Sequence, residues 1–381
     1  MGNIVLRGGE VFDPLTGSFH GRDVVMSGGR IVSSMGEVAV DEVIDVSGLV
    51  VSPGLVDLHT HIFRGQDLGL SADEIGRRSG TTTFVDAGSA GGHLFDAFRR
   101  TSIEPSSVRV RAFVNIASIG TTSIMLGGEL KALYYSDEKT AEDCVTGNRD
   151  VVVGVKVRAS ADVGGDNSPV ALKRARRVAD RVGLPLMVHL GPSPSGVDDI
   201  VGSLRRGDVL THSFSGWDGN QIVSAGSLRP SVRAARERGV VLDIGHGMSG
   251  FSAAVAATMI GEGEFPDTIS TDLHAYSASS VVDLPTVLSK FLALGMTLGQ
   301  VLTAATLAPA RVIGLDREGV GTLSAGAAAD IVVFRRTPGA VDFRDGFGGS
   351  FTGTERIVPV LTILGGRVVW DGLRTAAEVQ S

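Results

Sequence analysis

The sequence predicts an α/β protein in which a (β/α)8 TIM-like barrel is combined with a small β-sandwich formed by both chain ends. Between residues 54 and 316, apolar strand-like runs alternate with helical stretches. Eight such units in about 260 residues match the span of a (β/α)8 barrel. The flanking segments contain only short β-rich runs separated by glycine turns. A doubly wound sheet is the alternative, because alternation by itself does not prove that a sheet closes.

The two chain ends, residues 1–53 and 317–381, share this texture of short strands. Strands of this length need partners, and each end looks incomplete alone. We therefore expect both ends to pack together as one β-sandwich, divided in sequence by the barrel domain 54–316. The candidate strands are 3–7, 23–26, 30–33 and 41–45 at one end, and 321–326, 329–334, 357–363 and 367–370 at the other.

The central domain is expected to supply eight buried parallel strands with helices between them. In one of these helices Ser168 is placed to act as the cap, and Pro169 suits the first helical turn. The candidate strands are 54–61, 81–88, 108–116, 151–158, 184–190, 208–214, 240–246 and 268–273.

Composition indicates an acidic globular protein. The 381 residues can bury a large core, and the net charge of -7 comes without the lysine or arginine stripe that would indicate nucleic-acid binding. The N-terminus lacks a signal-peptide pattern and no apolar run reaches membrane-spanning length. We therefore expect a cytoplasmic protein that binds neither nucleic acid nor membrane. The single cysteine, Cys144, fits a reducing compartment, and without a nearby histidine it is interpreted as a buried or incidental thiol.

The most informative feature is His59-Thr-His61, at the end of the first barrel strand. Side chains two residues apart on a strand point to the same side, so both imidazoles can hold one metal ion. Later strands place further candidate ligands at the equivalent end, where α/β folds collect their chemistry. Lys156 lies inside an otherwise apolar strand, and a buried ammonium must be paired, neutralised or modified. The full set, which predicts a metal site, is His59, His61, Lys156, His189, His212 and Asp272.

This order of residues resembles the amidohydrolase superfamily along nearly the whole chain. The HxH strand, the lysine, the two single histidines and the late aspartate follow the order of that family, as do Ala305-Thr-Leu-Ala-Pro-Ala-Arg311 and Gly326-Ala-Ala-Ala-Asp330. Gly154-Val-Lys-Val-Arg158 and Asp243-Ile-Gly-His-Gly247 are similar to the amidohydrolase/deacetylase metallohydrolase branch, which is itself similar to dihydroorotases.

The resemblance implies a binuclear centre, usually of zinc. Lys156 would carry a CO2-derived carbamate that bridges both ions, which also resolves the burial of its charge. The nucleophile would be a metal-bridging hydroxide, with Asp272 acting first as general base and then as general acid. The implied ligands are His59, His61 and Asp272 for the more buried ion, and His189 and His212 for the more exposed one.

Residues that recognise the substrate are less evident. Arg158 lies two residues after Lys156 and faces the same way, so it could bind a substrate carboxylate or form a structural ion pair. His246 ends the seventh strand and is interpreted as a substrate contact, with a loop histidine as the alternative; His274 is equally ambiguous. Dihydroorotases carry an arginine at the fifth position of HxHxR, where this chain has Phe63. That departure argues against dihydroorotate as the substrate.

A G-x-G-x-x-G pattern at Gly245, Gly247 and Gly250 offers a competing interpretation as a dinucleotide site. The pattern follows the seventh strand and has no βαβ half of its own before it, which disfavours this interpretation.

We therefore expect a metal-dependent hydrolase that cleaves an amide or ester bond in a small acylated molecule bearing a carboxylate, such as an N- or O-acetyl acid. A cyclic amidase of the dihydroorotase or hydantoinase type is the alternative among enzymes. From another class, the chain could be a catalytically silent scaffold or binding protein, but such relatives typically lose metal ligands and all six are present here. The acyl group, the native metal and the formation of a homo-oligomer are left open.

Overall fold

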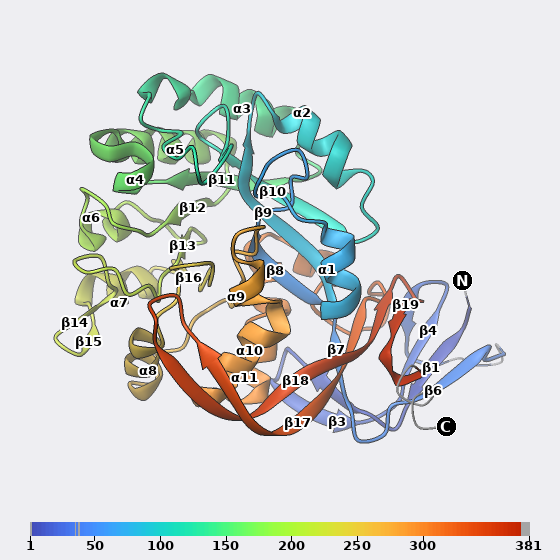
Figure 1. The fold of residues 1–381 in the computed structure, drawn as a ribbon. Helices are drawn as coiled ribbons and strands as arrows, with labels where there is room; N and C mark the ends of the chain where they lie inside the picture. Colours follow the sequence, from blue (N-terminus) through green and yellow to red (C-terminus); the bar gives the residue numbers. More distant parts are fainter. Residues whose placement is uncertain (1, 35, 37–38, 375–381) are drawn as a thin grey trace.

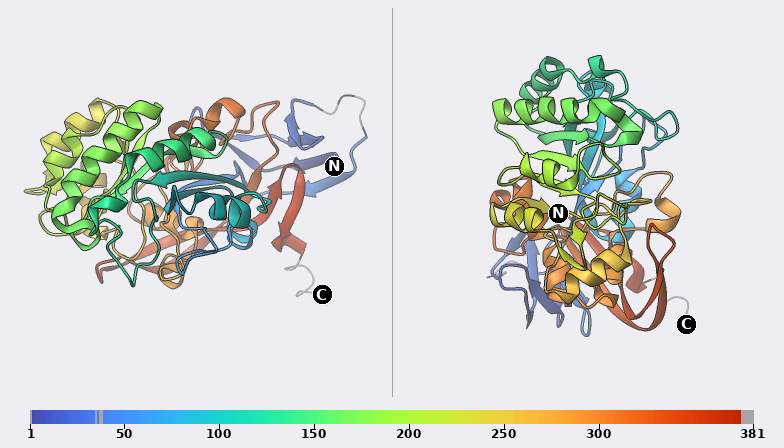
Figure 2. Two further views of the ribbon diagram at one scale, coloured as in Figure 1. Left: turned by 90° about the horizontal axis from the view of Figure 1, so that it is seen from above. Right: turned by 90° about the vertical axis from the view of Figure 1, so that its left-hand side faces the viewer.

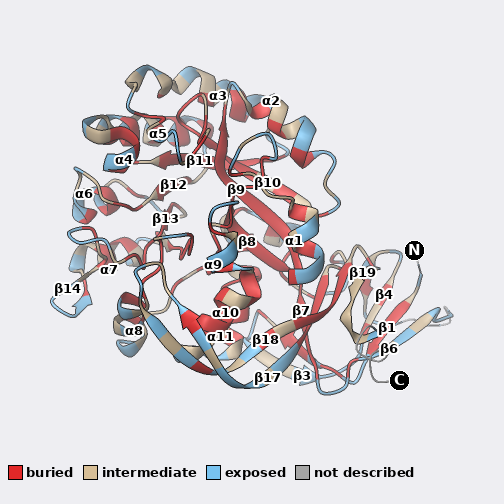
Figure 3. Ribbon diagram, in the orientation of Figure 1, coloured by how far each residue is buried: buried red, intermediate tan, exposed pale blue. Residues whose placement is uncertain are grey.

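The computed structural model describes residues 2–34, 36 and 39–374, and its centre is a curled parallel sheet of seven strands (Figure 1). The strand order is β16-β13-β12-β11-β10-β9-β8, so neighbours in the sheet follow one another along the chain. β8 and β9 are buried along their whole length, as expected for parallel strands covered on both faces (Figure 3). The strands are β8 (Leu55–Thr60), β9 (Thr81–Gly91), β10 (Arg109–Asn115), β11 (Val152–Arg158), β12 (Leu186–His189), β13 (Val209–Thr211) and β16 (Val241–Leu242).

Residues 268–273, predicted as the eighth strand, form no regular strand but lie between the two edge strands of this sheet. Thr268 makes a parallel bridge with Asp243, just after β16, and Leu273 makes one with Thr60 on β8. Asp272 interrupts the extended backbone between the bridges with a φ of 48°. Because both sheet edges contact this segment, an open doubly wound sheet does not describe the fold.

Helices follow most of the strands of the curled sheet, and a short hairpin of β14 (Val223–Ser224) and β15 (Ser227–Leu228) precedes α7. No helix in the described part of the chain is long and apolar enough to cross a membrane. The helices are α1 (Ala72–Ser79), α2 (Phe95–Phe98), α3 (Glu138–Gly147), α4 (Ala161–Gly164), α5 (Ser168–Val182), α6 (Val197–Gly202), α7 (Pro230–Glu237), α8 (Ala253–Gly261), α9 (Ala278–Val281), α10 (Leu284–Ala293), α11 (Leu298–Thr303) and α12 (Leu307–Val312).

α5 shows how the sequence pattern produces these helices. Its buried side chains include Leu172, Ala175 and Ala179, which recur at three- to four-residue spacing and face β11 and β12. Pro169 lies in the first turn, as predicted. The prediction that Ser168 caps the helix is wrong: Ser168 is already helical, and its hydroxyl donates to the Ser160 carbonyl.

The two chain ends meet in sheets beside the curled sheet (Figure 2). The β7 strand from one end pairs with β17 from the other, and one buried cluster contains Leu6, Val24, Val51, Ile331 and Ile363. The expected pairing of the ends is therefore present. The four-stranded sheet is β5 (Arg30–Val32), β4 (Val24–Ser27), β1 (Ile4–Arg7) and β6 (Glu42–Asp45). The six-stranded sheet is β19 (Arg367–Asp371), β18 (Ser350–Leu364), β17 (Ile331–Arg344), β7 (Val50–Pro53), β2 (Glu10–Asp13) and β3 (Ser18–Gly21).

Two features of these sheets differ from the prediction. Residues 321–326 form turns and irregular backbone rather than a strand, and Gly321 and Gly326 both adopt positive φ, which a strand does not allow. β17 and β18 are much longer than predicted and form a hairpin that extends past α10 towards α8 (Figure 1). Outside its base the hairpin carries mostly exposed residues, so its pattern does not resemble a core strand.

Candidate metal centre

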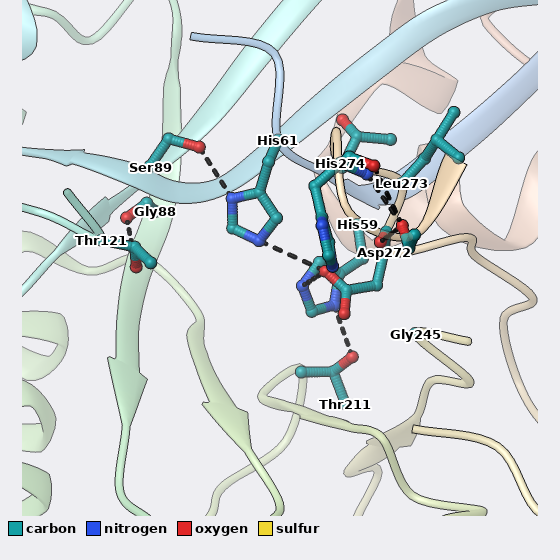
Figure 4. A network of polar contacts seen from close by, with 12 residues as sticks. His59, His61, Gly88, Ser89, Thr121, Thr211, Gly245, Asp272, Leu273 and His274 are labelled. Atoms are coloured by element: carbon teal, nitrogen blue, oxygen red, sulfur yellow. Dashed lines mark hydrogen bonds and ion pairs between the residues drawn. The ribbon is translucent and has the colours of Figure 1, made fainter. Parts of the chain in front are cut away.

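His59, on β8, and His61, directly after β8, both point at the carboxylate of Asp272. His59 Nε2 and His61 Nε2 each lie 3.2 Å from Asp272 Oδ1, and Figure 4 shows both rings directed at that side chain. The 268–273 segment brings Asp272 next to β8, where the Asp272 amide donates to the His59 carbonyl. The expectation that the two imidazoles face the same side of the strand is confirmed.

The histidines of the fifth and sixth strands lie on the same face of the sheet. The His212 ring centroid is 5.0 Å from that of His59 and 4.3 Å from that of His189. Ligand atoms of His59, His212 and Asp272 all lie within 4.8 Å of one another, a separation that a shared metal ion can bridge. All six predicted ligands line one cavity of about 310 Å³.

Lys156 lies in this cavity wall without a hydrogen-bond or salt-bridge partner among the described residues. The residue is 1% exposed, and Nζ makes no hydrogen bond with any described residue. Burial lowers the pKa of Lys156 to about 7, so a substantial fraction of the amine is neutral near pH 7. The aliphatic part of the Lys156 side chain packs directly on Gly88, where a side chain would leave no room: a Cβ at Gly88 would lie 2.8 Å from Cβ and Cγ of Lys156.

Electrostatics give the donors the protonation states that a metal requires. Burial lowers the pKa of His212 to about 4 and those of His59 and His189 well below their usual value, so these imidazoles are neutral. The pKa of Asp272 lies well below its usual value although burial acts to raise it, so this carboxyl is ionised. Neutral imidazoles beside a carboxylate form a donor set that fits a divalent cation.

Hydroxyl side chains orient the two histidines of β8. His59 Nδ1 lies 2.7 Å from Thr211 Oγ1, which in turn donates to Asp243 Oδ2 at 2.7 Å. Because the hydroxyl proton is directed at Asp243, His59 carries its proton on Nδ1 and leaves Nε2 free to bind a metal.

His61 and His212 are held in the same way. His61 Nδ1 lies 2.7 Å from Ser89 Oγ, which donates to Asp86 Oδ2 at 2.7 Å. His212 Nδ1 lies 2.6 Å from the Gly245 carbonyl and must therefore donate to it. Sequence reasoning missed Ser89 and Asp86, because isolated serines and aspartates are common and only their proximity to the histidines distinguishes them.

The backbone around the predicted ligands is strained. Only four described non-glycine residues have positive φ, and two of them are His212 at 59° and Asp272 at 48°. Non-glycine residues keep this strained backbone conformation where contacts from the surrounding structure hold it, which is often the case at functional sites. Asp57 supplies one such contact, accepting hydrogen bonds from the Thr271 amide at 3.0 Å and hydroxyl at 2.7 Å.

The G-x-G-x-x-G glycines pack against predicted ligands. A Cβ at Gly245 would lie 2.9 Å from His59 Nδ1 and 3.0 Å from His212 Nδ1. A Cβ at Gly247 would overlap the Asp272 carboxylate, and one at Gly250 would overlap the His212 ring. The pattern therefore reflects close approach of the loop to these side chains.

The sequence profile of the amidohydrolase family matches residues 50–369. The chain belongs to the amidohydrolase family. It is therefore a hydrolase of a family that generally uses divalent metal ions and acts on small molecules. The dinucleotide interpretation of the glycine pattern does not fit this structure, because the three glycines pack against the predicted metal ligands of an amidohydrolase.

Several relatives of this amidohydrolase are similar over most of its length. A deacetylase of Agrobacterium fabrum is 38% identical over 318 residues, which are 82% of this chain and 78% of that protein. A deacetylase of Brucella anthropi is 39% identical over 332 residues, 87% of this chain and 82% of that protein. The crystal structure of a dihydroorotase matches with a TM-score of 0.89 at 34% identity, covering 97% of this chain and 98% of that one.

Arg158 lines the cavity of this amidohydrolase and also forms an ion pair. Its Nη1 lies 3.4 Å from Glu129 Oε2, and both side chains are largely buried. The two interpretations of Arg158 are therefore compatible, since one guanidinium can hold Glu129 and present other donors to a ligand. His274 also lines the cavity, with its ring 6.0 Å from that of His61.

The structure does not place His246 in the cavity wall. Its Nε2 lies 2.8 Å from Lys290 Nζ, its Nδ1 lies 3.0 Å from the Gly247 carbonyl, and its ring stacks on Phe251. The expected substrate contact is thus wrong, because both ring nitrogens face protein groups and the residue is 1% exposed. Cys144 is buried as expected, and burial raises the pKa of its thiol to about 12.

Proposed function

We propose that this amidohydrolase is a metal-dependent deacetylase that removes an acetyl group from the nitrogen or oxygen of a small molecule bearing a carboxylate. The observation that carries the proposal is the convergence of six metal-type donors and one arginine on a single cavity. The deacetylases of Agrobacterium fabrum and Brucella anthropi, similar over most of the chain, support the reaction class.

The proposed cofactors are two divalent ions, zinc being the first choice for a set of imidazole and carboxylate ligands. The unpartnered, partly neutral Nζ of Lys156 supports a carbamate at this position. The amine would form a C–N bond to CO2 and release a proton, which replaces a buried cation by an anionic oxygen donor. In this proposal His59, His61 and Asp272 would hold one ion, and His189 and His212 the other. Because ligand atoms of His59, His212 and Asp272 lie within 4.8 Å of one another, the two ions would lie close together.

When bound, the ions would supply Lewis acidity that activates water and polarises the scissile carbonyl. The chain's own residues would position the reactants and move the proton. Asp272 would accept the proton of the attacking water at its carboxylate and deliver it to the leaving nitrogen or oxygen. Arg158 would bind the substrate carboxylate through guanidinium donors that Glu129 leaves free.

Three further expectations belong to this proposal. The seven strands together with residues 268–273 would constitute the eight-stranded barrel, and the two terminal sheets the β-sandwich, with boundaries at 53/54 and 316/317. The enzyme would work in the cytoplasm, and a homo-oligomer would be consistent with the fold.

The similarity to a dihydroorotase structure favours a cyclic amidase as the second candidate. Phe63 opposes this reaction on dihydroorotate, because the side chain at this position packs on Phe98, with ring centroids 5.1 Å apart, and offers no charge to a carboxylate.

The first test is metal content per chain, measured on protein grown without added metal, together with the mass of the Lys156 peptide under non-acidic conditions. About two equivalents of zinc and a carboxylated lysine are expected. Hydrolysis is then compared between a panel of N- and O-acetyl acids and a panel of cyclic amides. Turnover confined to the cyclic panel would replace the deacetylase assignment, and a protein that binds no metal when zinc is offered would overturn the catalytic proposal.

A further inference from the structure

The β17–β18 hairpin carries a turn, residues 345–349, to the mouth of the metal-site cavity. The Gly346 amide donates to the Phe251 carbonyl at 3.0 Å, and a Cβ at Gly346 would lie 2.5 Å from the Met248 carbonyl oxygen. Met248, Ser249 and Gly250 line the cavity. A segment from the C-terminal part of the chain thus supports a loop of the catalytic domain.

Two polar contacts hold this turn in place. Asp345 Oδ2 accepts a hydrogen bond of 2.9 Å from the Ala253 amide, at the N-terminus of α8, where a negative charge is favoured. Lys290 of α10 donates to the Arg344 carbonyl at 2.9 Å, and its Nζ also contacts His246 Nε2. Lys290 therefore joins the hairpin to the loop whose glycines pack against the predicted metal ligands.

The turn also supports an aromatic wall of the cavity. The Phe347 ring packs edge-on against Trp217, with centroids 5.5 Å apart at an interplanar angle of 81°. A Cβ at Gly216 would lie 3.1 Å from Phe347 Cγ, so the contact depends on glycine at that position. Trp217 and Met248 both line the cavity.

Trp217 and Met248 both expose apolar surface to solvent at the cavity mouth. Trp217 is 37% exposed and Met248 is 51% exposed, whereas the predicted metal ligands deeper in the cavity are mostly buried. Arg158 supplies positive charge to the same cavity. The cavity therefore combines a charged, buried interior with an apolar mouth.

We infer that Trp217 and Met248, held by Phe347 of the hairpin turn, form an apolar subsite that binds the side chain of the acid released by hydrolysis. The inference rests on the proposed deacetylase function and names the substrate class more closely: acetylated acids with a bulky apolar side chain. Trp217 and Met248 would contact the substrate, and Phe347 would act as a positioning residue. Contact with such a side chain excludes water from both exposed surfaces, which favours large apolar groups over small ones.

The test compares the hydrolysis of N-acetylphenylalanine, as each of its two enantiomers, with that of N-acetylglycine. Wild-type kcat/KM should be at least about tenfold higher for the larger substrate, the range that differences in apolar contact produce. Trp217→Ala and Met248→Ala should lower that ratio about tenfold, mainly through KM. Phe347→Ala should lower it less, and Phe347→Leu should restore most of the preference. Leu15→Ala, which removes another exposed apolar side chain but lies outside the cavity, should leave the ratio unaltered.

A binding measurement separates this inference from the proposed activity. Trp370→Phe leaves Trp217 as the sole tryptophan, so its fluorescence reports on the subsite. Zinc-loaded protein is titrated with phenylacetate and with acetate. Tighter binding of phenylacetate, reduced by Met248→Ala, would support the subsite even if no acetyl compound is hydrolysed. Equal affinity for both carboxylates, no fluorescence change with either, or an unaltered substrate ratio in Trp217→Ala would overturn it.

Discussion

Replacing Thr211 by valine tests whether the hydroxyl between His59 and Asp243 prepares the metal site. The substitution keeps the shape but removes the 2.7 Å contacts to both partners. His59 Nδ1 is left without its hydroxyl acceptor, while Asp243 keeps its hydrogen bonds from Ser270 and Thr268. One unsatisfied buried group costs about 1–3 kcal/mol, and loss of a ligand-orienting partner lowers metal affinity about 10- to 100-fold.

Zinc affinity is measured by competition with a chromophoric chelator, and stability by denaturant unfolding of the metal-free protein. Thr362→Val is the matched control, because the Thr362 hydroxyl is buried without a hydrogen-bond partner among the described residues. That control should bind zinc like the wild type and unfold at an equal or higher denaturant concentration. Unchanged zinc affinity in Thr211→Val would refute the argument that the hydroxyl orients His59.

Three further changes test other parts of the site. Gly245→Ala should lower zinc affinity more than Gly263→Ala does, measured by chelator competition. Both glycines have positive φ, but of the two only Gly245 lies close to predicted ligands. Equal losses of zinc affinity would assign the effect to backbone strain alone. The Lys156→Ala variant should hold fewer metal ions per chain, measured by elemental analysis, and should lose most of its activity. If the site needs a bridging carboxylate, added formate should restore part of that activity. Arg158→Lys should raise KM about tenfold for acids but not for their methyl esters, since a bidentate pair is lost; a uniform change would make Arg158 purely structural.

The donors of the candidate centre could be predicted because they occur at strand ends in a recognisable order. His59 and His61 are two residues apart, so strand periodicity alone directs both rings to the same side. Lys156 was conspicuous because a charged residue interrupts an apolar run. These signals are local, and no knowledge of neighbouring strands is needed to detect them.

The partners of these residues could not be predicted from local pattern. Thr211 and Ser89 contact His59 and His61 across 152 and 28 residues of sequence, and hydroxyl side chains are too common to stand out. His246 appeared equivalent to the other strand-end histidines, but the buried amine of Lys290, 44 residues away, occupies its Nε2. Contacts over such separations depend on how the helices and loops pack.

The sequence by itself determined the alternation of strands and helices, the pairing of the chain ends and the donors that gather at one edge of the sheet. Each follows from periodicity, strand length or side-chain chemistry along one stretch of chain. Only the tertiary structure decided that residues 268–273 lie irregularly between two sheet edges, that three glycines pack against predicted ligands, and that the hairpin turn at 345–349 supports the cavity mouth. These features arise from close approach between distant segments, and steric fit of that kind leaves no periodic trace in sequence.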